Sequence, residues 1–210
     1  YGVHTALDFC FYIEDWVRQY FTKPQYEIWQ ELRGKSVMPL KDEPKKDHYS
    51  VQKMRTFTPP SSDPQFVFSQ LCKNTEVACI KVRGYKLEAR KVSILLRTQG
   101  FDHLRAEIPL SRPTNFAHEI IEILRPLFED MYQANTQYRA TMVNLSELTA
   151  TEYQGDLFGG SVQVEAYRRL YQGIDTLRQK YGKDTVHFGS SFAAHQFSRH
   201  VAEREKVSQF

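Results

Sequence analysis

The chain has few cysteines and no long apolar segment. Cys10, Cys72 and Cys79 are an odd set without C-x-x-C spacing, which predicts reduced thiols and argues against a disulfide framework or a zinc site. Charged residues interrupt every apolar run well before the ~20 residues that a membrane span needs, and no N-terminal signal segment is visible. These absences favour a cytoplasmic protein with no membrane partner.

Groupings that would indicate catalysis or metal binding are also missing. The seven histidines do not cluster, and His195 and His200 have no set of Cys or carboxylate residues beside them to complete a metal site. Glu147, Glu152 and Asp156 have no base, nucleophile or metal partner that the sequence identifies. We therefore expect this chain to hold no catalytic residue, no metal site and no cofactor.

What the sequence does have is a local excess of positive charge. The 210 residues are 41% hydrophobic and 25% charged, with a formal net charge of +3, as expected for one large or two small globular domains. Residues 81–112 hold eight Lys and Arg against three acidic residues, a net charge of +5, so the remainder is slightly acidic. The sequence begins at Tyr1 with no initiator Met, and we expect it to be part of a longer protein.

Within this basic region, residues 89–98 alternate with the period of two that is typical of a strand. The predicted inward side chains are apolar: Val92, Ile94 and Leu96. The predicted outward side chains are mostly polar or cationic: Lys91, Ser93, Leu95 and Arg97. After a short turn at residues 99–102, His103, Arg105 and Glu107 continue the alternation in a second strand. A sheet face with rows of Lys and Arg is suited to a phosphate backbone.

The pattern of the whole chain predicts an α+β fold. We expect strands over residues 50–57, 89–98, 102–110 and 138–148, and helices over about 63–83 and 116–131. The order β-α-β-β-α-β predicts a four-stranded sheet with two helices on one face and an open second face. The cations are assigned to that open face.

The two ends of the chain have a different character. Residues 1–36 have apolar positions at helical spacing, with Thr5 as a cap, a break at Pro24 and a stop at Gly34. Residues 37–48 have the composition of a linker. A helix is expected over 161–181, and the weak periodicity after Gly189 predicts a loose segment or one that pairs with a partner.

These segments together resemble the C-terminal part of bacterial Y-family, translesion DNA polymerases. The resemblance lies in Ser50 to Phe57, Ala89 to Thr98, Ile108 to Leu110 and Arg139 to Leu148, which are similar to the strands of the little-finger domain. Residues 1–37, with Gly2 to Asp8 and Glu31 to Gly34, resemble the thumb, with its helix-hairpin-helix cut at the start. The implied domains are a thumb remnant (1–36), a linker (37–48), a little-finger domain (49–150) and a clamp-binding motif with a helical tail (151–210).

The resemblance implies that the parent protein is a DNA-directed DNA polymerase, a nucleotidyltransferase acting in DNA repair and the SOS response to DNA damage. The palm that binds the two catalytic metal ions, expected to be Mg²⁺, precedes the thumb in that family, and nothing in this chain matches its carboxylates. This chain would hold primer-template DNA and help to set tolerance of damaged templates. The sequence leaves open whether the parent resembles polymerase IV or the catalytic subunit of polymerase V.

By the same resemblance, residues of the little finger contact template and primer phosphates without reading sequence. The predicted DNA-binding set is Lys53, Arg55, Lys91, Ser93, Arg97, Arg105 and Arg139. In the thumb, Gly2, Val3 and His4 would form a hairpin whose backbone N–H groups face a phosphate. The simpler interpretations are that the cations keep an open sheet face soluble and that residues 2–4 are an ordinary helix cap.

A second motif lies at Gln154 to Gly160, where Leu157 and Phe158 stand in a polar, Gly-flanked segment. Two apolar side chains in an extended peptide are a common way to dock into a groove. The segment resembles the motif by which Y-family polymerases bind the bacterial sliding clamp, which assigns clamp binding to Gln154, Asp156, Leu157 and Phe158. The alternative is a loop anchored on its own domain.

Two other classes of protein share the β-α-β-β-α-β order. RNA-binding modules stack bases on aromatic residues of the central strands, and the outward positions of residues 91–97 hold none. A non-catalytic module would instead dimerise or bind protein through its open face, for which Leu95 is the best candidate. Weak self-association therefore stays an alternative to DNA binding.

Overall fold

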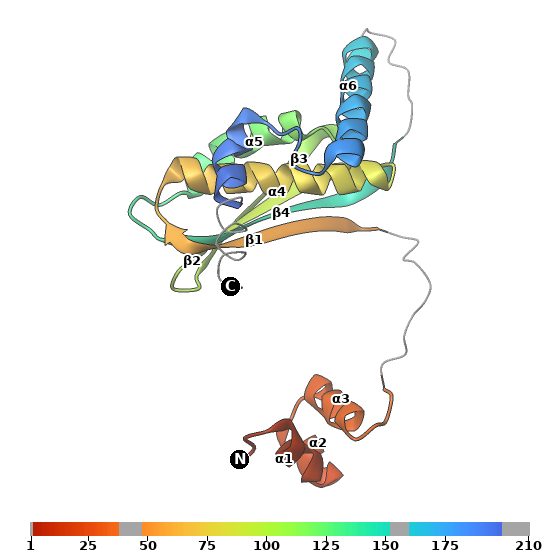
Figure 1. Ribbon diagram of the computed structural model, residues 1–210, viewed down its shortest axis with the longest axis vertical. Coiled ribbons are helices and arrows are strands. Elements are labelled where there is room, and N and C mark those ends of the chain that lie inside the picture. Colours follow the sequence, from red (N-terminus) through yellow and green to blue (C-terminus); the bar gives the residue numbers. More distant parts are fainter. Residues whose placement is uncertain (1, 38–47, 152–159, 199–210) are drawn as a thin grey trace. The chain divides into compact units, whose positions relative to one another are not determined.

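A computed structural model of the chain describes residues 2–37, 48–151 and 160–198 (Figure 1). The chain divides into two compact units, residues 1–46 and 47–210. The predicted linker lies almost wholly outside the described residues. The two units are described separately.

The first unit contains three short helices: α1 (Ala6–Phe11), α2 (Glu14–Tyr20) and α3 (Lys23–Leu32). The prediction of one continuous helix before Pro24 is wrong, because Tyr12 and Ile13 are extended and separate α1 from α2. Neither residue is a glycine or a proline, so the usual signal of a break is missing. An aromatic and a β-branched residue both favour extended backbone, and the Tyr12 ring stacks on Trp16 with 4.0 Å between centroids.

The later boundaries in this unit agree with the sequence. Pro24 lies in the first turn of α3, where its missing N–H costs nothing. Gly34 follows the helix with a φ of +80°, a left-handed conformation that glycine adopts without strain. Val17 and Trp29 are the buried apolar residues at the centre of the unit.

The second unit is built on a four-stranded sheet, and its α+β class is the predicted one. The strands are β1 (Ser50–Ser61), β2 (Leu87–Thr98), β3 (His103–Thr114) and β4 (Tyr138–Ala150). Their order across the sheet is β1-β4-β2-β3, and every neighbouring pair is antiparallel. The central strands β4 and β2 are therefore close in space although 39 residues of chain separate the end of β2 from the start of β4.

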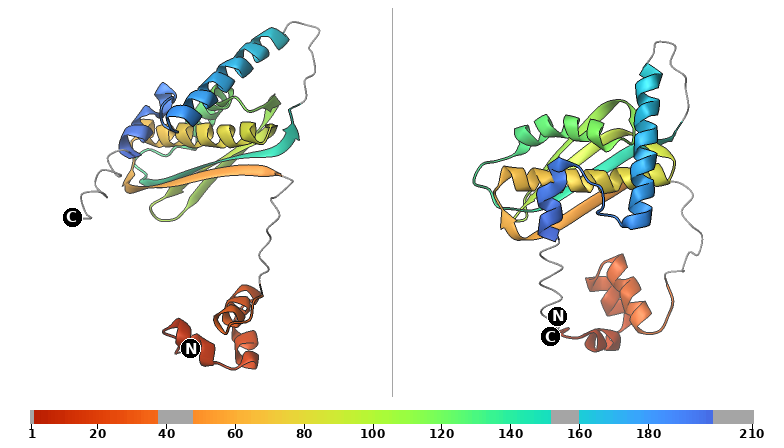
Figure 2. Two further views of the ribbon diagram at one scale, coloured as in Figure 1. Left: turned by 45° about the vertical axis from the view of Figure 1, so that its right-hand side comes forward. Right: turned by 45° about the horizontal axis from the view of Figure 1, so that its top comes forward.

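Two helices cover one face of the sheet: α4 (Pro64–Gly84) and α5 (Ala117–Met131) (Figures 1 and 2). The Asp63 carboxylate caps α4 by accepting the Gln65 backbone N–H at 2.9 Å, and Pro64 occupies the first turn. The predicted inward residues Val92, Ile94 and Leu96 are fully buried beneath these helices. The alternation in residues 89–98 thus correctly separated the core face from the open face.

Strand β1 is longer than predicted, because it continues through Pro59 and Pro60 to Ser61. A proline cannot donate a hydrogen bond within a sheet, and strands containing it are confined to edges or irregular positions. Both conditions hold here: β1 is an edge strand, and its register with β4 shifts between Thr56 and Ser61.

The C-terminal segment adds a further layer on the outer side of α4. It consists of α6 (Gly160–Tyr181) and a short helix at residues 192–198 (Figure 2). The prediction that residues after Gly189 are loose is wrong for the part described, since Ser191, Ala194 and His195 are buried. Phe197 also packs its ring against Phe66, with 5.2 Å between centroids. The other contact residues are small or polar, so the segment has no regular apolar periodicity. Among the helices of the described residues, none is long and apolar enough to cross a membrane.

Candidate nucleic-acid interface

The sheet face opposite α4 and α5, here called the open face, is defined by strand register. Residues directly opposite one another in neighbouring strands share a face. Leu95 lies opposite Arg105 on β3 and opposite Met142 on β4, and Met142 in turn lies opposite Met54 on β1. The same pairing assigns four charged residues and one histidine to the face: Lys91, Arg97, Arg105 and Glu107, with His103. Its uncharged polar members are Gln52, Thr56, Ser93, Asn144 and Ser146.

Lys53 and Arg55 are not on this face. They lie opposite Val143 and Thr141, which point toward the helices. The prediction that cations of β1 join those of β2 on one surface is therefore wrong. The reason is that a change of one residue in register moves every side chain of a strand to the opposite face, and sequence alternation does not determine the register between strands.

The centre of the open face is neutral. Ser93 lies opposite Asn144, whose amide nitrogen is 3.5 Å from the Ser93 hydroxyl. Leu95 is only 3% exposed although it belongs to the open face. It is therefore unavailable as the apolar contact on which the dimerisation alternative depended.

At one end of the open face, Lys91 is paired with two carboxylates. Its Nζ lies 2.8 Å from Glu147 Oε1 and 3.7 Å from Glu107 Oε1. The hydrogen bond to Glu147 is the main reason why the pKa of Lys91 is raised. The positive charge of Lys91 is thus largely offset by its neighbours before any ligand arrives.

At the other end, near the β2–β3 hairpin, the cations have an aromatic neighbour. The Cζ atoms of Arg97 and Arg139 lie over the Phe101 ring, at 4.5 Å and 4.7 Å from its centroid. An irregularity in the register of β2 and β4, between Arg97 and Thr98, occurs where Arg139 enters. Arg105 is exposed nearby on β3. Within the described ranges, no carboxylate forms an ion pair with any of these three arginines.

Sequence reasoning missed Phe101, which was assigned only to the turn between two strands. Its φ of 73° is in the left-handed region, which residues other than glycine rarely adopt. An aromatic residue in a hairpin turn that joins two cationic strands is the signal that was available.

The structure favours the simpler interpretation of residues 2–4. The Asp8 carboxylate accepts the backbone N–H groups of Thr5 at 2.9 Å and His4 at 3.2 Å, while the Thr5 hydroxyl accepts the N–H of Asp8. The pKa of Asp8 is lowered, chiefly by hydrogen bonding with the Thr5 side chain and also by the two backbone N–H groups. The chain's own carboxylate therefore occupies donors at this helix start, and Gly2 and Val3 precede it without a further role that the structure identifies.

The remaining predictions concern the clamp-binding residues, a metal site and the cysteines. Gln154, Asp156, Leu157 and Phe158 lie outside the described residues. Among the residues that the structure does describe, no group of three His, Cys, Asp or Glu side chains is arranged to hold a metal ion. Cys72 and Cys79 are buried, which raises the pKa of each thiol to about 12.

Comparison with known proteins gives one match by sequence and several by structure. The model of the impB/mucB/samB family C-terminal domain matches residues 48–157, more than half of the chain. No curated protein matches the chain. Similar solved structures include an insertion ternary complex of Dbh DNA polymerase, with 13% identity and a TM-score of 0.44. A Y-family chimera of Dbh and Dpo4 has 15% identity and a TM-score of 0.41.

In both cases the match covers 71% of this chain and 42% of the polymerase chain. The chain thus spans less than half the length of the polymerases that it resembles. The assignment rests on the sequence match, which coincides with the sheet and its two covering helices. The chain belongs to the impB/mucB/samB family, whose C-terminal domain it carries at residues 48–157.

Proposed function

We propose that this chain is the DNA-gripping part of a translesion polymerase and that the open face holds phosphates of primer-template DNA. One observation carries the proposal: Arg97, Arg105 and Arg139 gather at the hairpin end without a carboxylate partner in the described residues. A guanidinium presents a planar fork of donors that fits a phosphate group. Such contacts provide affinity without reading sequence, which suits an enzyme that must accept many templates.

The neutral centre of the open face is consistent with this role. Short polar side chains such as Ser93 and Asn144 allow a backbone to approach closely and offer hydrogen bonds to phosphate oxygens. Lys53 and Arg55 would have to reach the DNA from the other side of edge strand β1. We therefore expect them to contribute less than the arginines of the hairpin end.

The test is fluorescence anisotropy of the chain on labelled primer-template DNA at several salt concentrations. Each phosphate contact adds about 0.9 to the magnitude of the slope of log K against log salt. Replacing both Arg97 and Arg105 by Ala should weaken binding and flatten that slope by about 1–2. The matched control replaces Lys81 and Arg169, two exposed cations of α4 and α6, and should keep the slope. If the Arg97/Arg105 variant had the same slope as the wild type, the proposal would be refuted.

Polymerisation itself would belong to the parent protein. In this proposal the palm, with its metal-binding carboxylates, transfers the nucleotide, while the present chain retains the DNA during that step. We expect this chain to lengthen the time that the polymerase remains bound to primer-template DNA and to contribute to its tolerance of damaged templates. A parent polymerase carrying the Arg97/Arg105 substitutions should then synthesise shorter products in each binding event.

We also propose that residues 154–158 tether the polymerase to the bacterial sliding clamp. Burial of the Leu157 and Phe158 side chains in a pocket would contribute roughly 1.5–3 kcal/mol each before the cost of ordering the peptide. A peptide of residues 152–160 should bind purified clamp, and Leu157→Ala with Phe158→Ala should abolish that binding in the whole chain. The control Glu152→Gln should bind as the wild type does. Clamp binding that survives the double substitution would refute the tether.

Sedimentation of the chain with and without DNA addresses the alternative of dimerisation through the open face. With Leu95 covered, the central strands of this face offer little exposed apolar surface, and Met54 on edge strand β1 is 38% exposed. We expect a monomer without DNA.

A further inference from the structure

The β2–β3 hairpin holds an aromatic side chain in a constrained position. Phe101 is 56% exposed and has a φ of 73°. Such a conformation is costly for a residue other than glycine and persists where surrounding contacts determine it. The contacts here are Arg97, on the strand that leads into the turn, and Arg139, at the start of β4.

One ring therefore brings together two cations from different strands. Each guanidinium lies over the same electron-rich ring, whose quadrupole attracts a cation. Arg97 Nε and Arg139 Nε are buried and have no hydrogen-bond partner among the described residues. Buried donors of this kind are rare and call for an explanation.

Lys91, at the other end of the same face, shows the alternative arrangement. Its ammonium group is held by Glu107 and Glu147, so an incoming phosphate must compete with two carboxylates. Arg97 and Arg139 are held by an uncharged ring instead. A phosphate can bind them without displacing a negative charge.

We propose that Phe101 is a positioning residue that holds Arg97 and Arg139 as a site for the phosphate backbone of DNA. The proposal rests on the proposed function and adds a defined location and an organising residue to it. A guanidinium binds phosphate oxygens through parallel, charge-assisted hydrogen bonds, which need the correct orientation as well as the correct charge. The ring supplies that orientation.

A base stacked on Phe101 is the competing role for an exposed aromatic residue at a nucleic-acid surface. Two guanidiniums already lie over this ring. A base would have to compete with them for the ring. The contacts therefore favour a phosphate as the ligand.

The experiment replaces Phe101 and leaves every charge in place. Phe101→Ala should raise the Kd for primer-template DNA by about three- to tenfold, because loss of the ring contacts disorders both guanidiniums. Phe101→Leu retains an apolar side chain of similar size without the π-faces, and it should weaken binding by a similar factor. The control Phe192→Ala removes an equally exposed aromatic residue of the C-terminal segment and should not change the Kd. Thermal melting of each variant verifies folding.

A double-mutant comparison tests whether the three residues act as one unit. In a background with Arg97 and Arg139 both changed to Ala, Phe101→Ala should have no further effect on the Kd. A full additional loss in that background would overturn the proposal.

An oligonucleotide of abasic residues, which has phosphates but no bases, separates phosphate binding from stacking. The loss caused by Phe101→Ala should be the same on this probe as on ordinary DNA of the same strandedness. If Phe101→Ala weakened binding to ordinary DNA but not to the abasic probe, Phe101 would be assigned to base stacking and the proposal would be overturned. Unchanged binding by both Phe101 variants would also overturn it, and the Arg97/Arg105 result would still support the open face. A wild-type chain that binds neither probe at low salt would refute both proposals.

Discussion

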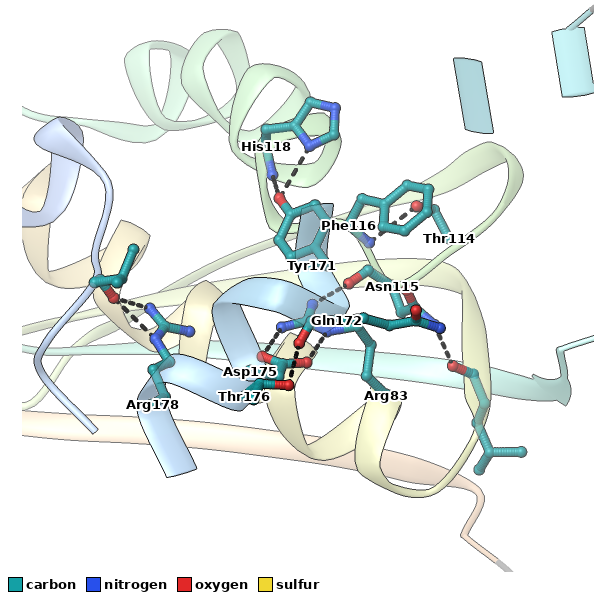
Figure 3. Close-up of polar contacts among 12 residues, drawn as sticks. Arg83, Thr114, Asn115, Phe116, His118, Tyr171, Gln172, Asp175, Thr176 and Arg178 are labelled. Atoms are coloured by element: carbon teal, nitrogen blue, oxygen red, sulfur yellow. Dashed lines mark hydrogen bonds and ion pairs between the residues drawn. The ribbon is translucent and has the colours of Figure 1, made fainter. Parts of the chain in front are cut away.

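The open face and the outer side of α4 both rely on arginine, and they use it in opposite ways. On the outer side of α4, Arg83 makes two bonds to Asp175, at 2.7 and 2.9 Å (Figure 3). The Arg178 guanidinium lies 2.7 Å from the Glu76 carboxylate. At the hairpin end of the open face, Arg97 and Arg139 contact an aromatic ring. In that second region no described acid forms an ion pair with them.

The comparison shows that the residues around an arginine determine whether it stabilises the fold or remains available to a ligand. The Arg83 guanidinium also lies over the Tyr171 ring at 4.5 Å and donates to the Asn115 carbonyl at 2.7 Å, so its donors are used within the fold. Burial raises the pKa of Tyr171 to about 12, and its hydroxyl group accepts the backbone N–H of His118 (Figure 3). A cation in such surroundings holds α6 to α4, whereas a cation without an acid remains available to a ligand.

The largest expected effect comes from breaking the pair between Arg178 and Glu76. Both side chains are almost completely buried, and removal of one partner leaves a buried charge without compensation. Arg178→Ala should therefore lower the free energy of unfolding by about 3–5 kcal/mol, measured by urea denaturation. Arg169→Ala, at an exposed position of the same helix, should cost less than about 0.5 kcal/mol. Equal stability of the two variants would mean that the ion pair does not secure α6.

A smaller effect on the same side of the molecule should depend on pH. His195 is 6% exposed, and burial, aided by the charges of Lys73 and His187, lowers its pKa to about 4, although Asp184 opposes the shift. Between about pH 6.5, the value for an unfolded histidine, and pH 4, the unfolded chain binds more protons at this site. Stability should be fully present above pH 6.5 and should fall as the pH decreases through that window.

Thermal melting at several pH values measures this effect. His195→Gln should lose less stability than the wild type between pH 6.5 and pH 4. The exposed residue His103 provides the control, since His103→Gln should keep the wild-type dependence. Parallel pH profiles for all three proteins would show that His195 does not titrate in this way.

On the open face, releasing Lys91 from its carboxylates should convert it into a better DNA ligand. Glu147→Gln removes the closer acid, which lies 2.8 Å from Lys91 Nζ. We expect binding to primer-template DNA to tighten by about two- to threefold at low salt, with a steeper salt dependence, measured by anisotropy. Glu122→Gln, on the exposed surface of α5, makes the same change of charge away from this face. Tightening by that control to the same degree would indicate a general effect of net charge.

The smallest effect is expected from removing Lys91 itself. Because Lys91 is already paired, Lys91→Ala should weaken DNA binding by less than about twofold at moderate salt, while Arg97→Ala should weaken it more. Anisotropy titrations of the two variants under one condition make the comparison direct. If Lys91→Ala weakened DNA binding more than Arg97→Ala does, the Lys91 end of the open face would be the stronger DNA contact, contrary to the prediction.

Residue patterns predicted the elements of the second unit well, because each depends on local periodicity. Alternation in residues 89–98 identified the buried trio Val92, Ile94 and Leu96, and the Asp63-Pro64 pair marked the start of α4. The same reasoning failed for the break at Tyr12 and Ile13. There the extended backbone depends on packing of the Tyr12 ring against Trp16, which no spacing rule expresses.

The sequence by itself determined the order of strands and helices, the apolar face of β2 and the cationic character of its other face. Strand pairing decided the rest: which cations share a surface, that Lys53 and Arg55 do not, and that Leu95 is covered. Tertiary contact also paired Arg178 with Glu76 across 102 residues and brought Arg139 to the ring that Arg97 contacts. The physical reason is that periodicity arises within one element. A partner across the sheet or from a later helix is selected by register and packing between elements.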